Sequence, residues 1–179
     1  MTDHATAQPP LVRIKNLCVD FQTENGWLRA VDQLSLTIPR GTTFGLVGES
    51  GCGKTVTAMS IPRLVPQPPG RISQGEIIFN GQDLLTLPAG AMRAIRGKDI
   101  GVIFQEPMTA LSPLLRIGDQ LAELIHIHRR VSHKDALAEA GDWLRRVGIP
   151  DPEQRLRAYP FELSGGMRQR VMIAMAMIL

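Results

Sequence analysis

The amino-acid sequence predicts an α/β fold in which a buried strand leads through a glycine-rich loop into a helix. Two short apolar runs, Thr43–Val47 and Ile100–Phe104, are typical of buried strands. From Ile117 to Arg157 the apolar residues recur with helical spacing instead. The chain has 179 residues, of which 44% are hydrophobic and 21% charged. This balance favours a protein with a folded core over a disordered one.

The first elements expected along the chain are two antiparallel strands. Residues 1–10 are polar and end in prolines, so we expect a flexible lead-in there. Apolar and polar residues then alternate from Leu11 to Phe21 and again from Leu28 to Ile38. Because Glu24-Asn25-Gly26 between them has the composition of a turn, the two runs predict a hairpin.

A helix is expected after the glycine-rich loop, and Pro62 or Pro66 must end it. Gly75–Phe79 then reads as a strand, and Asn80-Gly81 as the turn that follows it. The change to helical spacing near Pro107 marks the domain boundary. We therefore divide the chain into a lead-in, an α/β core and a helical region, at residues 1–10, 11–106 and 107–179.

The helical region carries two apolar stripes. One contains Leu121, Leu124 and Ile125, and the other is formed by Leu137, Trp143, Leu144 and Val147. The last nine residues, from Val171 to Leu179, are all apolar and lack a helix-ending signal. Such an end exposes apolar surface that a missing partner should cover. We therefore expect the sequence to be the front part of a longer protein, cut inside a helix.

The glycine-rich loop fits the pattern G-x-x-x-x-G-K-[ST] at every fixed position. In such a loop the backbone N–H groups turn inward around phosphate oxygens, and the helix that follows adds its positive end. Lys54 would reach the β- and γ-phosphates, and the Thr55 hydroxyl would bind Mg²⁺. A chance turn is disfavoured because a strand and a helix flank the loop. The sequence predicts a triphosphate site at Gly48, Glu49, Ser50, Gly51, Cys52, Gly53, Lys54, Thr55 and Val56.

A second glycine-rich segment, LSGGMRQ, begins at Leu163 and precedes the terminal apolar helix. Serine is a preferred N-cap residue, so we expect Ser164 to cap the helix, and Gly165 and Gly166 to expose N–H groups at its start. Since one triphosphate rarely needs two such sites, the second is best explained as serving a nucleotide held by another subunit. A simple capped helix is the alternative.

These segments together resemble one family. LSGGMRQR is similar to the signature segment of ABC ATPases, and Gln105 in VIFQEP resembles the glutamine loop of that family. The stretches FQEPMTALSP and YPFELSGGMRQRVMIAMA look like the ATP-binding subunits of dipeptide, oligopeptide and nickel importers. The resemblance runs from about Leu11 to Leu179. It implies a P-loop nucleoside triphosphatase core with an antiparallel β subdomain and a helical signature subdomain, incomplete at its C-terminus.

The resemblance also assigns roles to residues. In the family, two subunits trap two ATP molecules head to tail. Lys54 and Thr55 of one subunit would hold the phosphates and Mg²⁺, and Ser164 and Gly166 of the other would close over the γ-phosphate. Gln105 would sense Mg²⁺ and the attacking water. The resemblance therefore implies Lys54 and Gln105 as catalytic residues, and Thr55 and Gln105 as metal contacts.

An aromatic residue ahead of the loop stacks on adenine in the family. Phe21, at the end of the first expected strand, is our first choice by position, and Trp27 after the turn is the second. Either ring could instead pack within the strands. A stacked aromatic ring contributes about 1–3 kcal/mol per base.

The pattern of the family is not complete in these residues. An apolar strand ending in Asp and a catalytic Glu, called Walker B, is not found, nor is the switch histidine. Val102–Glu106 does not serve, because Gln105 stands where the metal-binding Asp should be and Pro107 follows Glu106. Hydrolysis requires such carboxylates. We therefore expect the full-length protein to be an ATPase, and these 179 residues alone to bind ATP weakly or not at all and to be inactive.

The resemblance implies an importer of peptides or similar solutes. Its partners would be a second ATP-binding subunit, identical or different, two transmembrane permease subunits and, indirectly, a solute-binding protein. The chain would lie on the cytoplasmic face of the bacterial inner membrane. The net charge of +3 is spread along the sequence, so we expect no nucleic-acid partner. The alternatives are a soluble ABC ATPase of DNA repair or translation, and a truncated remnant without catalysis.

Overall fold

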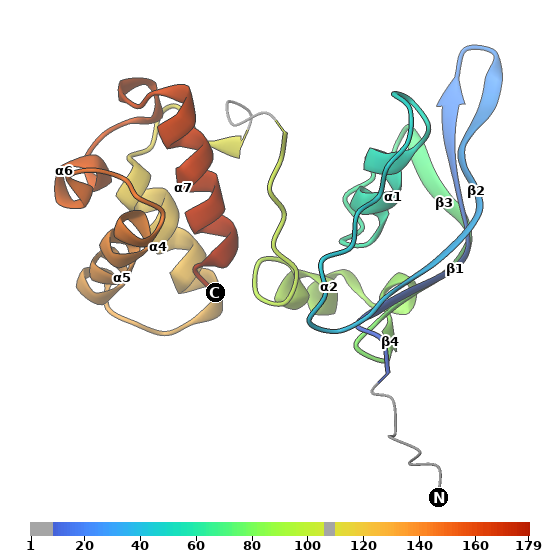
Figure 1. Ribbon diagram of the computed structural model, residues 1–179, viewed down its shortest axis with the longest axis horizontal. Coiled ribbons are helices and arrows are strands. Elements are labelled where there is room, and N and C mark those ends of the chain that lie inside the picture. The colour runs from blue at the N-terminus through green and yellow to red at the C-terminus, as the bar shows by residue number, and fades with distance from the viewer. Residues whose placement is uncertain (1–8, 106–109) are drawn as a thin grey trace, which may run out of the picture. The chain divides into compact units, whose positions relative to one another are not determined.

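The structure is a computed structural model that describes residues 9–105 and 110–179 (Figure 1). It divides into two compact units, Met1–Met92 and Arg93–Leu179. The domain division that we predicted between residues 106 and 107 falls outside the described residues and stays a prediction. Glu106 and Pro107, which we used to reject a Walker B strand, also lie there.

The first unit contains a four-stranded antiparallel sheet. Its strands are β1 (Val12–Thr23), β2 (Gly26–Ile38), β3 (Gly70–Phe79) and β4 (Gln82–Asp83), in the order β2-β1-β3-β4. The predicted hairpin is confirmed, with β1 paired to β2 through a turn at residues 24–25. Strand β3 is also confirmed and begins earlier than predicted, at Gly70. The buried apolar residues of this unit include Ile14, Leu17, Val19, Ile77 and Leu84.

Helix α1 (Lys54–Ser60) follows the glycine-rich loop and ends before Pro62, as predicted. The Ser60 hydroxyl donates a hydrogen bond to the Val56 carbonyl at 2.7 Å. Figure 1 shows α1 beside the sheet, and α1 contacts β2. The short 3-10 helix η1 (Leu84–Thr86) and helix α2 (Ala89–Ile95) complete this part of the chain.

The prediction that Thr43–Val47 and Ile100–Phe104 form strands is wrong. Neither run lies in a strand, although Ile100 makes an isolated parallel bridge with Arg96. Val47 is 90% exposed. A strand needs a neighbour to receive its backbone hydrogen bonds. Among the described residues no strand pairs with either run, so apolar composition alone leaves both without regular structure.

The second unit is helical. Its elements are α4 (Ile117–His128), α5 (His133–Arg146), α6 (Pro152–Leu156), the 3-10 helix η2 (Pro160–Glu162) and α7 (Gly165–Met177). The two predicted apolar stripes are confirmed as core: Leu121 and Ile125 of α4 and Leu144 of α5 are fully buried, and the other stripe residues pack against them.

Helix α7 supplies the third wall of this core. Val171 and Ala174 are fully buried, whereas Met177 at the end of the helix is 56% exposed.

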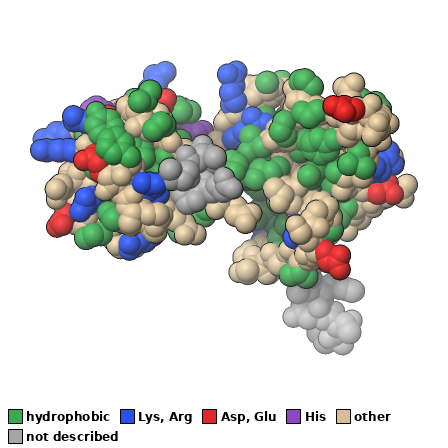
Figure 2. Space-filling view, turned by 90° about the horizontal axis from the view of Figure 1, so that it is seen from above, with side chains coloured by type: hydrophobic (Ala, Val, Ile, Leu, Met, Phe, Trp, Pro, Cys, Tyr) green, Lys and Arg blue, Asp and Glu red, His purple; other side chains and the backbone are tan. Residues whose placement is uncertain are grey.

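Hydrophobic side chains also cover much of the visible face of the first unit in Figure 2, while Lys and Arg side chains stand out from the second. Of the helices that the structure describes, none has the length and apolar character required to cross a bilayer.

Candidate nucleotide-binding site

The glycine-rich loop adopts a backbone that only glycine tolerates at its last turn. Gly53 is the N-cap of α1 and lies in the left-handed region, with φ of +88°. A Cβ on Gly53 would lie 2.5 Å from the Ala30 carbonyl oxygen of β2. Since real Cβ atoms do not approach an oxygen so closely, Gly53 allows the loop to lie directly against the sheet.

The start of α1 presents free backbone donors to the loop. No side chain caps this helix, and the first hydrogen bond back to the loop is from Thr57 N–H to the Gly53 carbonyl, at 2.8 Å. The N–H groups of Lys54, Thr55 and Val56 precede that bond and have no helical carbonyl to meet. Donors at a helix start, with the positive end of the helix dipole behind them, suit a phosphate oxygen.

The ammonium group of Lys54 lies inside the loop. It donates a 2.8 Å hydrogen bond to the Gly48 carbonyl, a second bond to the Glu49 carbonyl, and a weaker contact of 3.6 Å to the Cys52 sulfur. The loop therefore surrounds the lysine with its own acceptors. A phosphate would replace these carbonyls with charged oxygens, which form stronger hydrogen bonds with an ammonium group.

A pocket of about 160 Å³ opens beside this loop. Its lining carries backbone donors, one ammonium and one hydroxyl, and no carboxylate. This donor set fits the phosphates of a nucleotide, and the Thr55 hydroxyl is the side-chain oxygen in the lining that fits Mg²⁺. The residues that line it are Ala30, Gly51, Gly53, Lys54, Thr55 and Val56. Of the predicted phosphate site, Gly48, Glu49 and Cys52 contribute through their contacts with Lys54, and Ser50 lies exposed in the loop.

The strand register separates the two aromatic candidates onto opposite faces of the sheet. Phe21 pairs with Gly70, and its neighbour two residues before, Val19, pairs with Val31. Paired and alternate residues share one face. The Cγ2 atom of Val31 would lie 3.4 Å from a Cβ on Gly53. Phe21 therefore shares the face on which the glycine-rich loop rests, called the loop-side face below.

Trp27 belongs to the other face. It pairs with Gln22, which lies two residues after Asp20. The Arg71 guanidinium lies over the Trp27 ring, 3.7 Å from its centroid. One side of this ring is therefore already covered, and the ring faces away from the loop. The register thus favours Phe21 over Trp27 as the residue nearer the loop, and its adenine contact stays a prediction.

Three charged residues of three strands meet on this second face. The buried Asp20 carboxylate accepts a hydrogen bond from Arg29 Nε at 3.0 Å and forms an ion pair with Arg71 at 3.4 Å. The hydrogen bond from Arg29, then one from Ser73, lower the pKa of Asp20 below its ordinary value. The same contact with Asp20, followed by one with Asp32, raises the pKa of Arg29. This cluster joins β1, β2 and β3.

The Asp20 cluster was not predicted from the sequence. Its members are 9 and 51 residues apart along the chain, so no local spacing relates them. A lone Asp inside an apolar strand, at Asp20 in LCVDF, was the available signal, because a buried carboxylate requires partners.

The second predicted site lies at the start of α7, in the helical unit. The Ser164 hydroxyl accepts a hydrogen bond from Met167 N–H at 3.3 Å, so Ser164 is the N-cap that the sequence predicted. Gly165 and Gly166 are exposed, and a Cβ on either would meet nothing within 4 Å. Leu163, which is buried, anchors the segment from below. The surface around both glycines is therefore open to an approaching group.

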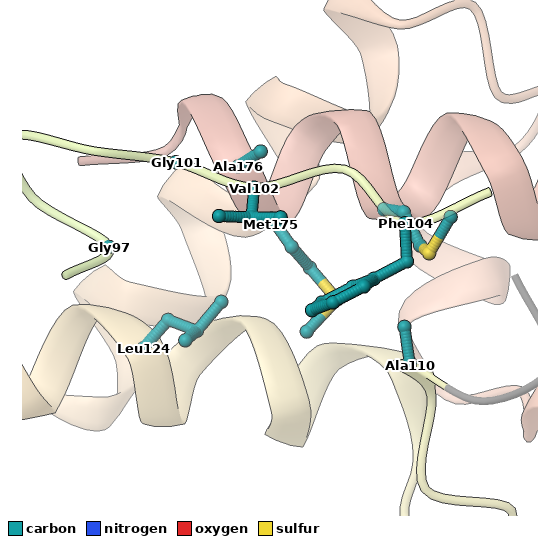
Figure 3. A pocket seen from close by; sticks show the side chains of 9 residues that line it. Gly97, Gly101, Val102, Phe104, Ala110, Leu124, Met175 and Ala176 are labelled. Carbon is teal, nitrogen blue, oxygen red and sulfur yellow. The ribbon is translucent and has the colours of Figure 1, made fainter. Parts of the chain in front are cut away.

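Gln105 lies exposed in the helical unit, directly after the apolar run Ile100–Phe104. The residue before it, Phe104, lines an apolar pocket of about 180 Å³ between this run, α4 and α7 (Figure 3). Figure 3 shows the Phe104 ring directed into the pocket together with Leu124 of α4 and Met175 of α7. The Phe104 side chain, which is 40% exposed, therefore contacts this pocket from the position next to Gln105. The loop with Lys54 belongs to one unit and Gln105 and Ser164 to the other, and their roles at one site stay predictions.

Relatives of known description match nearly the whole chain. The chain is 49% identical over 168 residues to the dipeptide transport ATP-binding protein DppD of Bacillus subtilis, covering 94% of this chain and 50% of that protein. It is 45% identical to the oligopeptide transport ATP-binding protein OppD of the same organism, covering 93% of this chain and 47% of OppD. The chain therefore spans about half the length of these curated relatives.

Solved structures and a family model agree with these matches. The fold is similar to that of the dimeric ATP-binding cassette MJ0796 in a post-hydrolysis state bound to ADP and Pi, with a TM-score of 0.82 and 25% identity. That match covers 93% of this chain and 69% of the cassette. The family described as ABC transporter matches residues 31–179. The α/β fold predicted from the sequence is confirmed, and the chain belongs to the ABC transporter family.

Proposed function

We propose that this chain is part of the ATP-binding subunit of an ABC importer, which couples ATP binding and hydrolysis to the uptake of peptides or similar small solutes. Relatives that are 45% and 49% identical are described as oligopeptide and dipeptide transport ATP-binding proteins, which supports the solute class. The proposal concerns the whole protein, because activity and partners belong to the assembled transporter.

The observation that carries the proposal is the loop around Lys54. Its glycines allow the loop to rest on the sheet, α1 presents uncapped N–H donors, and the ammonium group already occupies the loop interior. Few arrangements other than a phosphate site require all three features together.

Each residue of the site has one task in this proposal. Lys54 neutralises the phosphate charge, and the N–H groups at the start of α1 orient the phosphate oxygens. Thr55 supplies a hydroxyl ligand to Mg²⁺, which lowers the charge on the transferred phosphoryl group when bound. Gln105 orients water near that group. Phe21 stacks on the base from the loop-side face.

The assembly follows from the open helix start at Ser164. Its N–H groups and the exposed Gly165 and Gly166 would face the nucleotide held by a second ATP-binding subunit. The dimeric state of MJ0796 supports such a pairing. Two permease subunits would hold the pair at the cytoplasmic face of the membrane, and a solute-binding protein would deliver the peptide outside.

The test uses the full-length protein in a bacterial host whose own copy is deleted. Uptake of a labelled dipeptide and ATP hydrolysis by the purified transporter are measured for the wild type and for Lys54→Ala. Both activities should fall to background in Lys54→Ala. Lys15→Ala is the matched control, because Lys15 forms only an exposed ion pair with Glu76 in the same unit, and it should behave as the wild type. Dipeptide uptake that survives Lys54→Ala would overturn the proposal.

A further inference from the structure

The ring of Phe21 lies in the space where residue 70 would carry a side chain. Gly70 is the first residue of β3 and the direct partner of Phe21 in the β1–β3 ladder. A Cβ built on Gly70 would lie 2.9 Å from Phe21 Cε1. Real Cβ atoms do not approach another carbon so closely, so the ring edge rests where only a glycine leaves room for it.

Two other atoms close the same space. A Cβ on Gly70 would also lie 2.7 Å from Val65 Cγ1 and 2.8 Å from the Pro66 carbonyl oxygen. Val65 is buried. The Phe21 ring therefore occupies a defined space, called its seat below, which is bounded by the Gly70 backbone and lies near the Val65 side chain.

Backbone hydrogen bonds hold this seat in place. Gly70 N–H donates to the Pro66 carbonyl at 2.8 Å, which closes the turn before β3. Gln22 N–H donates to the Pro69 carbonyl at 2.9 Å, which ties the residue after Phe21 to the same turn. Because the first bond closes the turn and the second ties it to β1 next to the contact, a shift at Gly70 should displace the ring or the strand that carries it.

We propose that Gly70 is a positioning residue for the adenine base: it leaves the room in which Phe21 is held on the loop-side face. The inference rests on the proposed function, since it concerns the nucleotide bound at the same loop. In this proposal Gly70 affects the bound base through the Phe21 ring, whereas the phosphates are bound by Lys54 and α1. A change at Gly70 should therefore alter recognition of the base and leave recognition of the triphosphate intact.

The experiment compares two ligands on the full-length protein. Binding of Mg²⁺·ATP and of Mg²⁺·tripolyphosphate, which has no base, is measured by calorimetry for Gly70→Ala, Phe21→Ala and the double variant. Loss of a base stack corresponds to about a 5- to 150-fold weaker ATP affinity. We expect that loss in Phe21→Ala, and a loss of at least about 5-fold in Gly70→Ala. The double variant should be no weaker than Phe21→Ala alone, and every variant should keep its tripolyphosphate affinity within about 2-fold.

Gly90→Ala is the matched control. Gly90 lies in α2, and a Cβ there meets nothing within 4 Å, so this variant should bind both ligands as the wild type does. Val65→Leu is a second probe, because the longer side chain fills the same space from the other side. It should reproduce the selective loss of ATP affinity, and it decides the question if Gly70→Ala does not fold.

Three results would overturn the role of Gly70. The first is wild-type ATP affinity in Gly70→Ala, or in Val65→Leu where that variant decides. The second is an equal loss of ATP and tripolyphosphate affinity, which would show a structural effect on the whole unit. The third is a double variant whose loss of ATP-binding free energy equals the sum of the losses in Gly70→Ala and Phe21→Ala. Failure of the proposed function looks different, because the wild type would then bind neither ligand.

Discussion

The Lys54 ammonium lies 2.8 Å from the Gly48 carbonyl oxygen, so the loop binds its own lysine with the geometry of a full hydrogen bond. A triphosphate entering the loop must therefore exchange carbonyl contacts for phosphate contacts at this nitrogen. The exchange is favourable because phosphate oxygens carry charge, whereas the carbonyl oxygens are neutral.

Lys54→Arg should therefore bind ATP poorly although it keeps the positive charge. A guanidinium is planar and longer than the lysine side chain, and it cannot place one nitrogen among the Gly48, Glu49 and Cys52 acceptors. Loss of one charge-assisted bond costs about 1.5–3 kcal/mol, so ATP affinity should fall about 10- to 150-fold. Calorimetric titration of the full-length protein checks this, and equal affinity for the two side chains would contradict the role of the point charge.

Gly53→Ala should unfold more easily than Gly51→Ala. Both glycines have positive φ, of +88° and +83°, so each alanine incurs backbone strain of about 1–3 kcal/mol. Only Gly53 also approaches the Ala30 carbonyl, whereas a Cβ on Gly51 meets nothing within 4 Å. The thermal midpoints of the two variants measure the difference. Equal midpoints would show that the loop does not rest on β2 as described.

Ser164→Ala should lower the stability of the protein and also stop ATP hydrolysis. Loss of the N-cap bond to Met167 costs about 1 kcal/mol of stability. Ser132→Ala is the matched variant, because Ser132 caps α5 through a similar bond to Asp135 N–H, at 3.1 Å. The two variants should lose similar stability by thermal unfolding, and only Ser164→Ala should lose ATPase activity in the assembled transporter. Normal hydrolysis in Ser164→Ala would reduce this residue to a helix cap.

The Asp20 cluster should make stability depend on acid pH. Its folded-state pKa is lowered, first by the hydrogen bond from Arg29, so its contribution is complete above the unfolded pKa of about 3.9. That contribution is lost as the pH falls through the lower folded-state value. Asp20→Asn should therefore be less stable than the wild type at pH 7, and the difference should shrink as the pH falls below about 4 and through the lowered folded-state pKa of Asp20. Urea unfolding of both proteins at pH 7 and at successively lower pH measures this. A stability difference that does not change with pH would argue against the ion pairs.

The hairpin and both glycine-rich segments could be predicted because their signals are local. Alternation between Leu11 and Ile38 predicts that β1 and β2 form and pair, and the Lys54 loop is defined by eight consecutive residues. The Ser164 cap is likewise a property of four neighbours. In each case the residues that determine the structure stand next to one another in the chain.

Other features depend on residues far apart and were missed or left open. The run at Thr43–Val47 has strand composition, yet composition does not supply the neighbouring strand. The choice between Phe21 and Trp27 needed the bulge at Ala30, where the pairing passes from Val19 with Val31 to Asp20 with Arg29. Such irregularities of the ladder are not visible in residue type.

Asp20 and Phe21 are adjacent, and their side chains serve opposite faces of one strand. Removing a single residue from β1 ahead of them would exchange the two faces unless a bulge absorbed the change. A carboxylate would then point toward the phosphate loop, and an aromatic ring would displace the ion pairs. Removing two residues would restore both. Length variation in this strand should therefore occur in steps of two, or in single steps that a bulge absorbs, as the register shift between Ile14 and Leu17 already does.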